Sequence, residues 1–425
     1  MKVLVVGSGG REHALVWKIA QSPVISAILA APGSAAISEL ATCHDIPVSD
    51  LDGLVELARA EAVDLVVIGP ENPLCDGLAD QLRQAGINTF GPSKLASRLE
   101  ASKAFAKDFY ARHNVPSARY GTFSNAGEAK AFLDQFEPPY VLKADGLAAG
   151  KGVVIVSDRG EAETEIDAFL SGKFGEASKT LVIEEFMAGE EVSIFALCDG
   201  ETVLYCGAAQ DHKRVGEGDT GPNTGGMGAY SPAPIAKPEL IETAMKTIIE
   251  PVANGLAAEG SPFQGVLFAG LMVTPEGPKV VEFNIRFGDP ECQVLMMRIE
   301  DDILPYLEAT ATGGLAGMPP LRWTAEPAIT VVMAANGYPE AYEKGSVIGG
   351  VDDANKMEGV VVFEAGTARN ADGERTANGG RVLNVTASGE TLHYAVDRAY
   401  AAIDEIDWPE GFCRRDIAWR ALKTH

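Results

Sequence analysis

The sequence of 425 residues lacks any long apolar run. No stretch of about 18 apolar residues occurs, so a membrane-spanning helix is not expected. Residues 1–10 enter a short apolar segment directly, without the basic start, long apolar stretch and cleavage site of a signal peptide. We therefore expect a cytoplasmic protein with no membrane partner.

Cysteine, histidine and positive charge are also sparse. None of the six cysteines forms a CxxC pair and the six histidines form no HExxH motif, so neither a zinc site nor a disulfide framework is indicated. Acidic residues outnumber basic ones by 60 to 35, which gives a net charge of −25 and argues against nucleic-acid binding. A local cationic cluster can still bind phosphate within an acidic protein.

What is present is a globular composition, with 46% hydrophobic and 22% charged residues, and a length that allows about three domains. Strand-like and helix-like segments alternate over the first hundred residues, which predicts a parallel sheet covered by helices. The predicted fold is an α/β multidomain chain: an N-terminal parallel-sheet domain (residues 1–102), a central domain (103–325) with a small α/β lid (about 119–188), and a small β-rich C-terminal domain (326–425).

Two further segments are interpreted by pattern. Residues 95–114 are rich in Ala, Lys and Leu, which predicts one long helix. Residues 211–234 are polar and rich in Gly and Pro, which predicts a long loop, and loops of this length are usually functional or disordered.

The first glycine motif follows the first predicted strand, with the spacing Gly7-x-Gly9-x-x-Glu12. The third glycine of the dinucleotide fingerprint is missing, and no acidic residue ends the second strand, so both features weigh against NAD. Backbone N–H groups of Gly9 and Gly10, together with Arg11, could still hold an anion at a helix N-terminus. The alternative is a simple tight connection.

A second glycine-rich segment follows a strand that carries Lys143. It contains Gly150, Lys151 and Gly152 and returns directly into another strand, as a lid over a polyphosphate would. The Walker spacing fails, because Gly152 stands where Ser or Thr is needed and no helix follows. An ordinary flexible hairpin is the alternative.

Two acidic segments complete the candidates. Residues 181–191 could hold a nucleoside through Glu184, Glu185, Phe186 and Glu191, although such a segment is more often a solvated turn. In residues 280–291, the alternation of a strand places Glu282, Asn284 and Arg286 on one face. Glu and Asn oxygens suit Mg²⁺ bound to phosphate, and Arg286 could stabilise a phosphoryl group or bind a carboxylate. The alternative is an edge strand with a solvated face.

The polar segment after residue 210 adds Asp211, which could bind an amine, and Lys213 with Arg214, which could bind a phosphate. His212 is as well explained by a structural role as by a catalytic one. An exposed face and a mobile loop are the alternatives for the basic pair and the glycines.

Together these segments resemble the ATP-grasp enzymes and, within them, the family of phosphoribosylamine–glycine ligases. The segments that carry the resemblance span the chain: residues 7–14, 69–71, 143–152, 211–214, 223–231 and 286–293. Asn72 departs from the pattern, which has Ala after Gly-Pro-Glu. The resemblance implies a pre-ATP-grasp domain, an ATP-grasp domain and a C-terminal domain.

The resemblance also implies a reaction: ATP, glycine and 5-phosphoribosylamine give glycinamide ribonucleotide, ADP and phosphate through glycyl phosphate, in purine biosynthesis. It implies Mg²⁺ or Mn²⁺ and a monomer. For ATP, the resemblance implies that Lys103 and Lys143 bind the phosphates, that Gly150, Lys151 and Gly152 form the lid, that Glu184, Glu185 and Phe186 bind adenine, and that Glu191 binds ribose. It implies that Glu282 and Asn284 bind the metal and that Arg286, Lys143 and Lys151 are catalytic. The substrate-binding residues that it implies are Gly9, Gly10, Arg11, Glu71, Asp211, Lys213, Asn223, Arg286 and Asp289.

Three other functions compete with this interpretation. A biotin-carboxylase-like carboxylase shares the fold but uses bicarbonate, and a nucleotide sensor would bind ATP without turnover. A nicotinamide dehydrogenase is disfavoured by the incomplete glycine motif.

Overall fold

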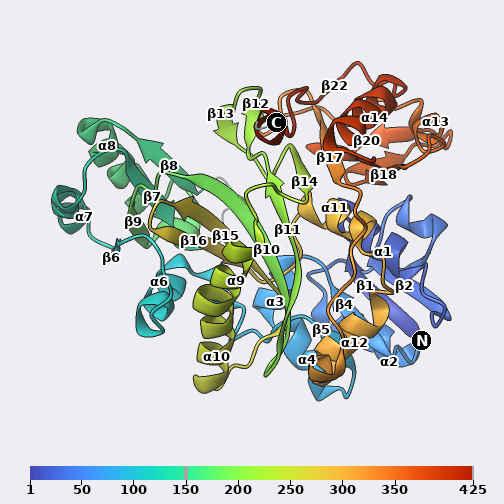
Figure 1. The fold of residues 1–425 in the computed structure, drawn as a ribbon, viewed down its shortest axis with the longest axis horizontal. Helices are drawn as coiled ribbons and strands as arrows, with labels where there is room; N and C mark the ends of the chain where they lie inside the picture. Colours follow the sequence, from blue (N-terminus) through green and yellow to red (C-terminus); the bar gives the residue numbers. More distant parts are fainter. Residues whose placement is uncertain (148–151, 424–425) are drawn as a thin grey trace.

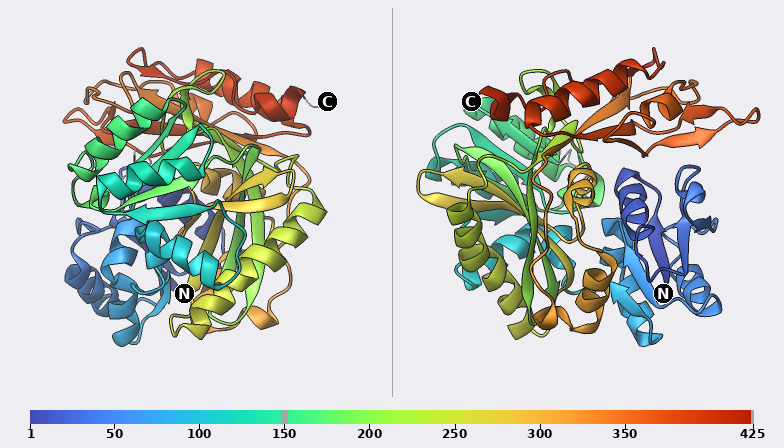
Figure 2. Two further views of the ribbon diagram at one scale, coloured as in Figure 1. Left: turned by 90° about the vertical axis from the view of Figure 1, so that its left-hand side faces the viewer. Right: turned by 45° about the vertical axis from the view of Figure 1, so that its right-hand side comes forward.

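The computed structural model describes residues 1–147 and 152–423 of the chain. Figure 1 shows the N-terminal segment in blue below the C-terminal segment in red, with the lid on the opposite side and the strands β10, β11, β15 and β16 of a large sheet in the centre. The same arrangement is visible from two further sides in Figure 2, where the C-terminal part lies above the N-terminal part.

The predicted N-terminal parallel sheet is confirmed. Its strand order is β3-β2-β1-β4-β5, and every neighbouring pair is parallel. The apolar residues of β1 are fully buried, as expected for a strand covered on both faces. The elements are β1 (Lys2–Gly7), α1 (Gly10–Ile19), β2 (Ala27–Pro32), β3 (Thr42–Cys43), α2 (Leu51–Ala60), β4 (Leu65–Ile68), α3 (Glu71–Asp76), α4 (Leu78–Gln84) and β5 (Asn88–Phe90).

The single helix predicted over residues 95–114 is wrong. Two helices occur, α5 (Arg98–Ala101) and α6 (Lys103–Arg112), separated by Ser102 in an extended conformation. The Ser102 hydroxyl accepts a hydrogen bond from the N–H of Phe105, so it caps the second helix. This break places Lys103 in the first turn of α6.

The lid is a four-stranded antiparallel sheet with two covering helices. Its strand order is β6-β9-β7-β8, and its core includes Leu142, Ile166, Phe169 and Ile183. This cluster is separate from the apolar cores of the rest of the chain. The elements are β6 (Tyr120–Phe123), α7 (Ala126–Phe132), β7 (Tyr140–Ala144), β8 (Val153–Val156), α8 (Arg159–Leu170) and β9 (Leu181–Glu185).

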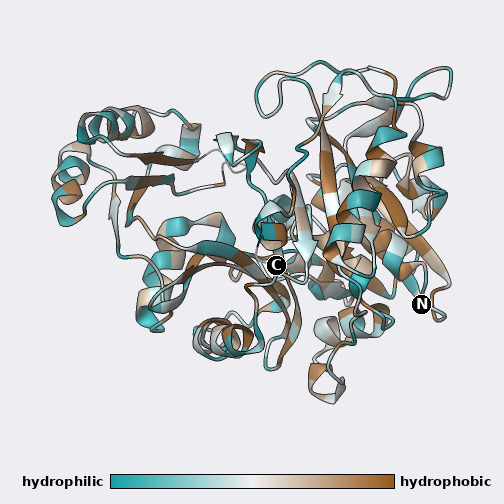
Figure 3. Cartoon of the chain, turned by 45° about the horizontal axis from the view of Figure 1, so that its top comes forward, coloured by the Kyte–Doolittle hydropathy of each residue, from teal (hydrophilic) through white to brown (hydrophobic). Residues whose placement is uncertain are grey.

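The largest sheet of the described residues has nine strands and runs through the centre of the molecule. Its order is β16-β15-β10-β11-β14-β17-β21-β18, with β22 paired to β17. Its strands are β10 (Glu190–Asp199), β11 (Val203–Asp211), β14 (Gly228–Ser231), β15 (Gln264–Thr274), β16 (Gly277–Asn284), β17 (Ala328–Ala335), β18 (Val360–Glu364), β21 (Arg381–Ser388) and β22 (Gly411–Phe412). The strands are strongly apolar in Figure 3, whereas the helices alternate in hydropathy.

The loop predicted over residues 211–234 is partly wrong. It contains a short hairpin, β12 (Arg214–Gly216) with β13 (Thr220–Asn223), and then β14 of the large sheet. Because β14 pairs with β17, the C-terminal strands continue the central sheet across the predicted boundary at residue 325. The domain boundaries themselves stay a prediction.

The remaining helices flank the large sheet. They are α9 (Pro238–Ala244), α10 (Glu250–Ala258), α11 (Glu291–Arg298), α12 (Leu304–Thr312), α13 (Val351–Ala354), α14 (Leu392–Asp404) and α15 (Trp419–Lys423); the small strands β19 (Thr367–Arg369) and β20 (Arg375–Ala377) form a hairpin. Within the described residues, none of the helices combines the length and the apolar character that crossing a membrane requires.

Candidate active site

A buried carboxylate joins two lysines where the lid meets the rest of the chain. Glu184 on β9 accepts from Lys143 on β7 at 2.9 Å and lies 3.2 Å from Lys107 on α6. The Lys143 ammonium group also lies 3.5 Å from the carbonyl of Val281 on β16. Lys143 therefore reaches from the lid to the acidic strand of the large sheet, as its predicted role requires.

Lys103 approaches the same region from the start of α6. Its ammonium group donates to the carbonyl of Gly146 at 3.3 Å, and burial lowers its pKa, which the nearby Glu282 carboxylate opposes. Lys143 is close enough to lower the pKa of Lys103 as well. Two cationic side chains thus converge beside Glu282.

A third cation, Lys213, is also close enough to Glu282 for their charges to interact. Lys213 contacts Glu191 at 2.6 Å and Asp211 at 3.1 Å. Burial alone would lower the pKa of Lys213, but Asp211, Glu191 and Glu282 raise it well above its ordinary value. Glu191, Asp211 and Glu282, which were predicted to bind ribose, an amine and a metal, therefore lie around Lys213.

Glu282 and Asn284 fit a magnesium ion bound to phosphate oxygens. They lie two residues apart on β16, so their side chains leave the same face of the strand. Within residues 1–147 and 152–423, neither side chain forms a hydrogen bond or salt bridge. In the same ranges, no cluster of three or more His, Cys, Asp or Glu could hold a metal alone. Mg²⁺ commonly takes one or two protein oxygens and completes its shell with phosphate and water.

Arg286 lies beyond the end of the strand, so the predicted extension of the strand to this residue is wrong. Strand β16 ends at Asn284, and Arg286 lies in a bend. Its guanidinium group is 3.2 Å from Glu71 and 3.3 Å from Glu100. Burial opposes the charge of Arg286, but these carboxylates raise its pKa above the ordinary value, so it stays cationic.

A second polar cluster surrounds the N-terminus of α1. Gly9 caps this helix, and its N–H donates to Glu12 at 2.7 Å. Arg11 contacts Glu12 at 2.6 Å and donates to the carbonyl of Phe287 at 3.2 Å. A Cβ atom on Gly9 would lie 3.8 Å from the carboxylate of Asp289, so the glycine turn and the segment around residue 289 are neighbours.

Gly10 is close to two amide side chains. A Cβ atom there would lie 2.2 Å from Asn384 and 2.8 Å from Gln293, so any larger residue would require one of these buried amides to shift. The predicted substrate residues Gly9, Gly10, Arg11, Glu71, Arg286 and Asp289 therefore form one continuous cluster, linked to Glu282 by the electrostatic influence of Glu100.

The other predicted residues are less closely connected. Gly150 and Lys151 lie outside the described residues, whereas Gly152 accepts from the N–H of Ala144 at 2.8 Å. The Phe186 side chain is 45% exposed, and Glu185 pairs with Arg119. Asn223 ends the β12–β13 hairpin, and its side chain bonds to none of the other candidates within the described part of the chain.

Four residues of the site were not predicted: Glu100, Lys107, Glu291 and Arg381. Lys107 could have been found, because it lies four residues after Lys103 on a predicted helix and so faces the same side. Glu291 is 4% exposed, and burial together with the nearby Asp211 raises its pKa to about 7. Arg381 contacts Asp289 from a distant segment, which no local pattern indicates.

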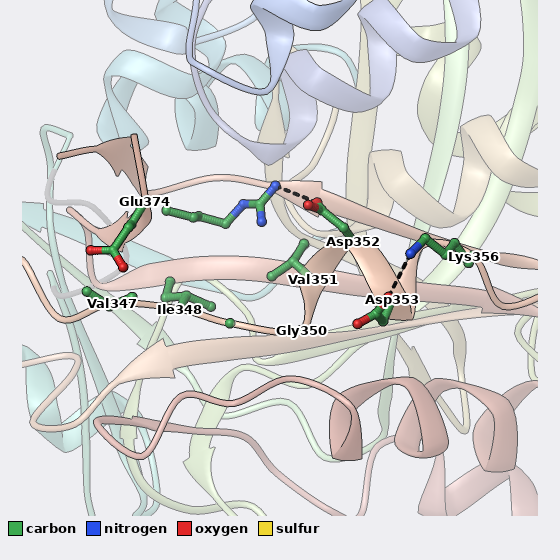
Figure 4. Close-up of a pocket in the computed structure, with 10 residues that line it drawn as sticks. Val347, Ile348, Gly350, Val351, Asp352, Asp353, Lys356 and Glu374 are labelled. Carbon is green, nitrogen blue, oxygen red and sulfur yellow. Dashed lines mark hydrogen bonds and ion pairs between the residues drawn. The ribbon is translucent and has the colours of Figure 1, made fainter. Parts of the chain in front are cut away.

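A hollow of about 410 Å³ in the C-terminal part does not belong to this site. Two ion pairs line it, Arg375 with Asp352 at 3.0 Å and Lys356 with Asp353 at 2.7 Å. Figure 4 shows the second pair among the labelled lining residues. None of the predicted site residues lines it.

The fold and the site together define a class. A lid whose lysine-bearing strand faces an acidic strand of a large antiparallel sheet, next to a parallel-sheet domain, is the arrangement of an ATP-grasp enzyme. A solved structure of biotin carboxylase from Campylobacter jejuni shares the fold, with a TM-score of 0.73 at 16% identity over 99% of this chain and 95% of that chain.

The family follows from the sequence. The phosphoribosylglycinamide synthetase family matches in three consecutive parts: its N domain over residues 1–100, its ATP-grasp (A) domain over 101–292 and its C domain over 328–420. The chain belongs to this family of ATP-grasp ligases, and the resemblance inferred from the sequence is confirmed.

Named relatives support the same conclusion. The phosphoribosylamine–glycine ligase of Mesorhizobium japonicum is 58% identical over 99% of both chains. The chloroplastic ligase of Arabidopsis thaliana is 52% identical over 97% of this chain and 79% of its own length. The crystal structure of phosphoribosylamine–glycine ligase from Thermotoga maritima has a TM-score of 0.84 at 33% identity and covers 98% of this chain and all of that chain (100%).

Proposed function

We propose that this enzyme joins glycine to 5-phosphoribosylamine at the expense of ATP and forms glycinamide ribonucleotide, ADP and phosphate, a step of purine biosynthesis. The observation that carries the proposal is the convergence of Lys103, Lys143 and Lys213 around Glu282. Three cations beside an oxygen ligand suit a metal-bound polyphosphate. The full-length similarity to phosphoribosylamine–glycine ligases supports the choice of the other two substrates.

The chemistry requires activation of a carboxylate. An unactivated carboxylate is a poor acyl donor, because attack on it would have to expel an oxide. Transfer of the γ-phosphoryl group of ATP to glycine gives glycyl phosphate, and the amine of phosphoribosylamine then displaces phosphate. Such transfers depend mainly on alignment and on neutralisation of charge.

Different residues bind the phosphates, the nucleoside and the metal ion. Lys103 and Lys143 hold the phosphates, and the lid segment with Gly150, Lys151 and Gly152 covers them. The backbone of Glu184 to Phe186 holds the adenine, so the Glu184 side chain stays paired with lysine, and Glu191 holds the ribose. Glu282 and Asn284 would hold Mg²⁺ or Mn²⁺, which neutralises charge on the phosphates when bound. Arg286 stabilises the transferred phosphoryl group or the glycine carboxylate.

The two substrates occupy neighbouring clusters. Asp211, with Lys213 beside it, binds the amine of glycine, while Gly9, Gly10 and Arg11, near Asp289 and Glu71, bind phosphoribosylamine; Asn223 contributes from the hairpin. We also propose that the enzyme acts as a monomer in the cytoplasm.

Phosphate release with each substrate omitted in turn tests this function. Release should require ATP, a divalent cation and glycine, and glycinamide ribonucleotide should form only when phosphoribosylamine is added. Bicarbonate in place of glycine should not support release; if it does, a carboxylase function is favoured. Binding of ATP without any turnover would indicate a nucleotide sensor.

A further inference from the structure

Two lysines share one buried carboxylate oxygen in the lid. Glu184 Oε2 is 2.9 Å from the Lys143 ammonium group and 3.2 Å from that of Lys107. The exposed fractions of the three side chains are 3%, 7% and 2%, so water contributes little to their solvation. One carboxylate needs only one cation for neutrality, and the second lysine therefore requires an explanation.

The two lysines differ in their other contacts. Lys143 also reaches the carbonyl of Val281, next to the proposed metal ligand Glu282. Lys107 instead donates to the carbonyl of Ala118 at 3.3 Å and lies 5.8 Å from the ring centre of Tyr120. Lys143 therefore has a second contact beside the proposed metal site, whereas the other contacts of Lys107 lie at residues 118–120.

We propose that Lys107 is a positioning residue for ATP. When the Lys143 side chain moves from the Glu184 carboxylate to the phosphates of ATP, Lys107 remains as the ion-pair partner of Glu184. The proposal rests on the phosphate-binding role that the proposed function gives to Lys143. A buried carboxylate left without a cation is costly. Without Lys107, binding of ATP by Lys143 would leave Glu184 in that state, so the cost would oppose nucleotide binding.

The charges around Lys107 agree with this role. Burial lowers its pKa to about 8, the Glu184 carboxylate opposes that effect, and the Lys143 ammonium group adds to it. The other facing groups are the Glu185 carboxylate and the Tyr120 ring. When Lys143 moves away, a neighbouring positive charge is removed, and the protonated form of Lys107 becomes more stable. Lys107 is then the cation that neutralises Glu184.

The main test compares Lys107→Met with the double variant Lys107→Met/Glu184→Gln. The single variant should raise both KM and Kd for ATP at least tenfold and change kcat less than threefold. The double variant should recover most of the ATP affinity, because a neutral amide does not need a cation and does not retain Lys143. A role of Lys107 in packing alone predicts no such recovery, and that result would overturn the proposal.

The control is Lys130→Met, which removes a partly exposed lysine of the lid that pairs with Asp167. Its ATP affinity should equal that of the wild type. Unchanged ATP binding by Lys143→Met would instead refute the role of Lys143 and thus that part of the proposed function. Weak ATP binding by Lys143→Met together with normal binding by Lys107→Met would refute the inference alone.

A measurement on the unmodified enzyme covers the case in which Lys107→Met does not fold. The Kd for ATP, measured by calorimetry between pH 7 and 9.5, should rise as Lys107 loses its proton near pH 8. A constant Kd across this range would overturn the proposal.

Discussion

Arg381 and Asp289 connect the C-terminal part of the chain to the candidate site. The Arg381 guanidinium group donates to the backbone carbonyl of Asp289 at 2.6 Å, and it lies 3.4 Å from the carboxylate of the same residue. It also donates to the carbonyl of Gly225 at 2.8 Å. One side chain of β21 therefore fixes two segments that border the proposed substrates.

Replacement of Arg381 by Met should weaken the binding of phosphoribosylamine. Burial would raise the pKa of the Asp289 carboxylate, but Arg381 and Arg11 keep it low, so the variant leaves this buried charge with less compensation. We expect the KM for phosphoribosylamine to rise about tenfold, which corresponds to about 1.4 kcal/mol. Steady-state kinetics would measure this, with the KM for ATP as an internal reference.

A suitable control is Arg322→Met, which removes an arginine that is 72% exposed and pairs with Asp301. It should leave all KM values unchanged. Equal effects of the two substitutions would show that Arg381 has no specific role at the site.

Loss of Glu282 should abolish turnover without loss of the fold. Its carboxylate is the proposed metal ligand, so Glu282→Ala should reduce kcat by at least 10²-fold, as expected when charge stabilisation at a transferring phosphoryl group is lost. Phosphate release at several Mg²⁺ concentrations and thermal unfolding would be measured together.

The β15–β16 hairpin supplies the control. Glu276 is 75% exposed and pairs with Lys279, so Glu276→Ala removes a carboxylate from the same hairpin without affecting the site. Normal turnover of Glu282→Ala with an unchanged Mg²⁺ dependence would remove the metal assignment.

Glu291 should make glycine binding depend on pH near neutrality. Burial and Asp211 raise its pKa to about 7, while Lys213 opposes them. Above this pH the site holds an additional negative charge beside Asp211, which favours a positively charged amine. The KM for glycine should therefore fall as pH rises from 6 to 8.

In Glu291→Gln, this pH dependence should disappear and the KM for glycine should stay high. Glycine saturation curves at several pH values would show it. A pH dependence equal to that of the wild type would mean that a different group titrates.

The sequence predicted those parts of the site that depend on local pattern. Glu282 and Asn284 are recognisable because side chains two residues apart on a strand share a face. The glycine turn at residues 9 and 10 is recognisable because small residues permit the close approach of side chains seen at Gly10. These features need no knowledge of the tertiary structure.

The parts that were missed depend on contacts between distant segments. The pairing of β14 with β17 joins residues about a hundred positions apart, and its short strand lies within a Gly-rich region that resembles a loop. Arg381 reaches Asp289 through the same long-range arrangement. The helix break at Ser102 was missed because helix-forming residues lie on both sides of it, although the preference of serine for N-caps was a signal that could have located the break.

The free energy of unfolding should decrease as pH falls below neutrality, because His13 is buried in its neutral form. Its Nδ1 accepts the N–H of Glu364 at 3.0 Å, and the ring packs edge-on against Phe363, so it joins α1 to β18. Burial lowers the pKa of His13 to about 4, although the Glu364 carboxylate opposes this. Because the unfolded chain takes up the proton near pH 6.5 and the folded chain does not, stability is lost between these values, by about 2 kcal/mol at pH 5.

The His13→Gln variant tests this sign. It removes the titrating ring while it retains a polar side chain, so its urea midpoint should fall less than that of the wild type between pH 7 and pH 5. Because a multidomain chain need not unfold in one step, the midpoint should be that of the transition in which α1 and β18 unfold. Equal shifts in both proteins would show that His13 is protonated without cost in the folded state, and that the contact between α1 and β18 tolerates the charge.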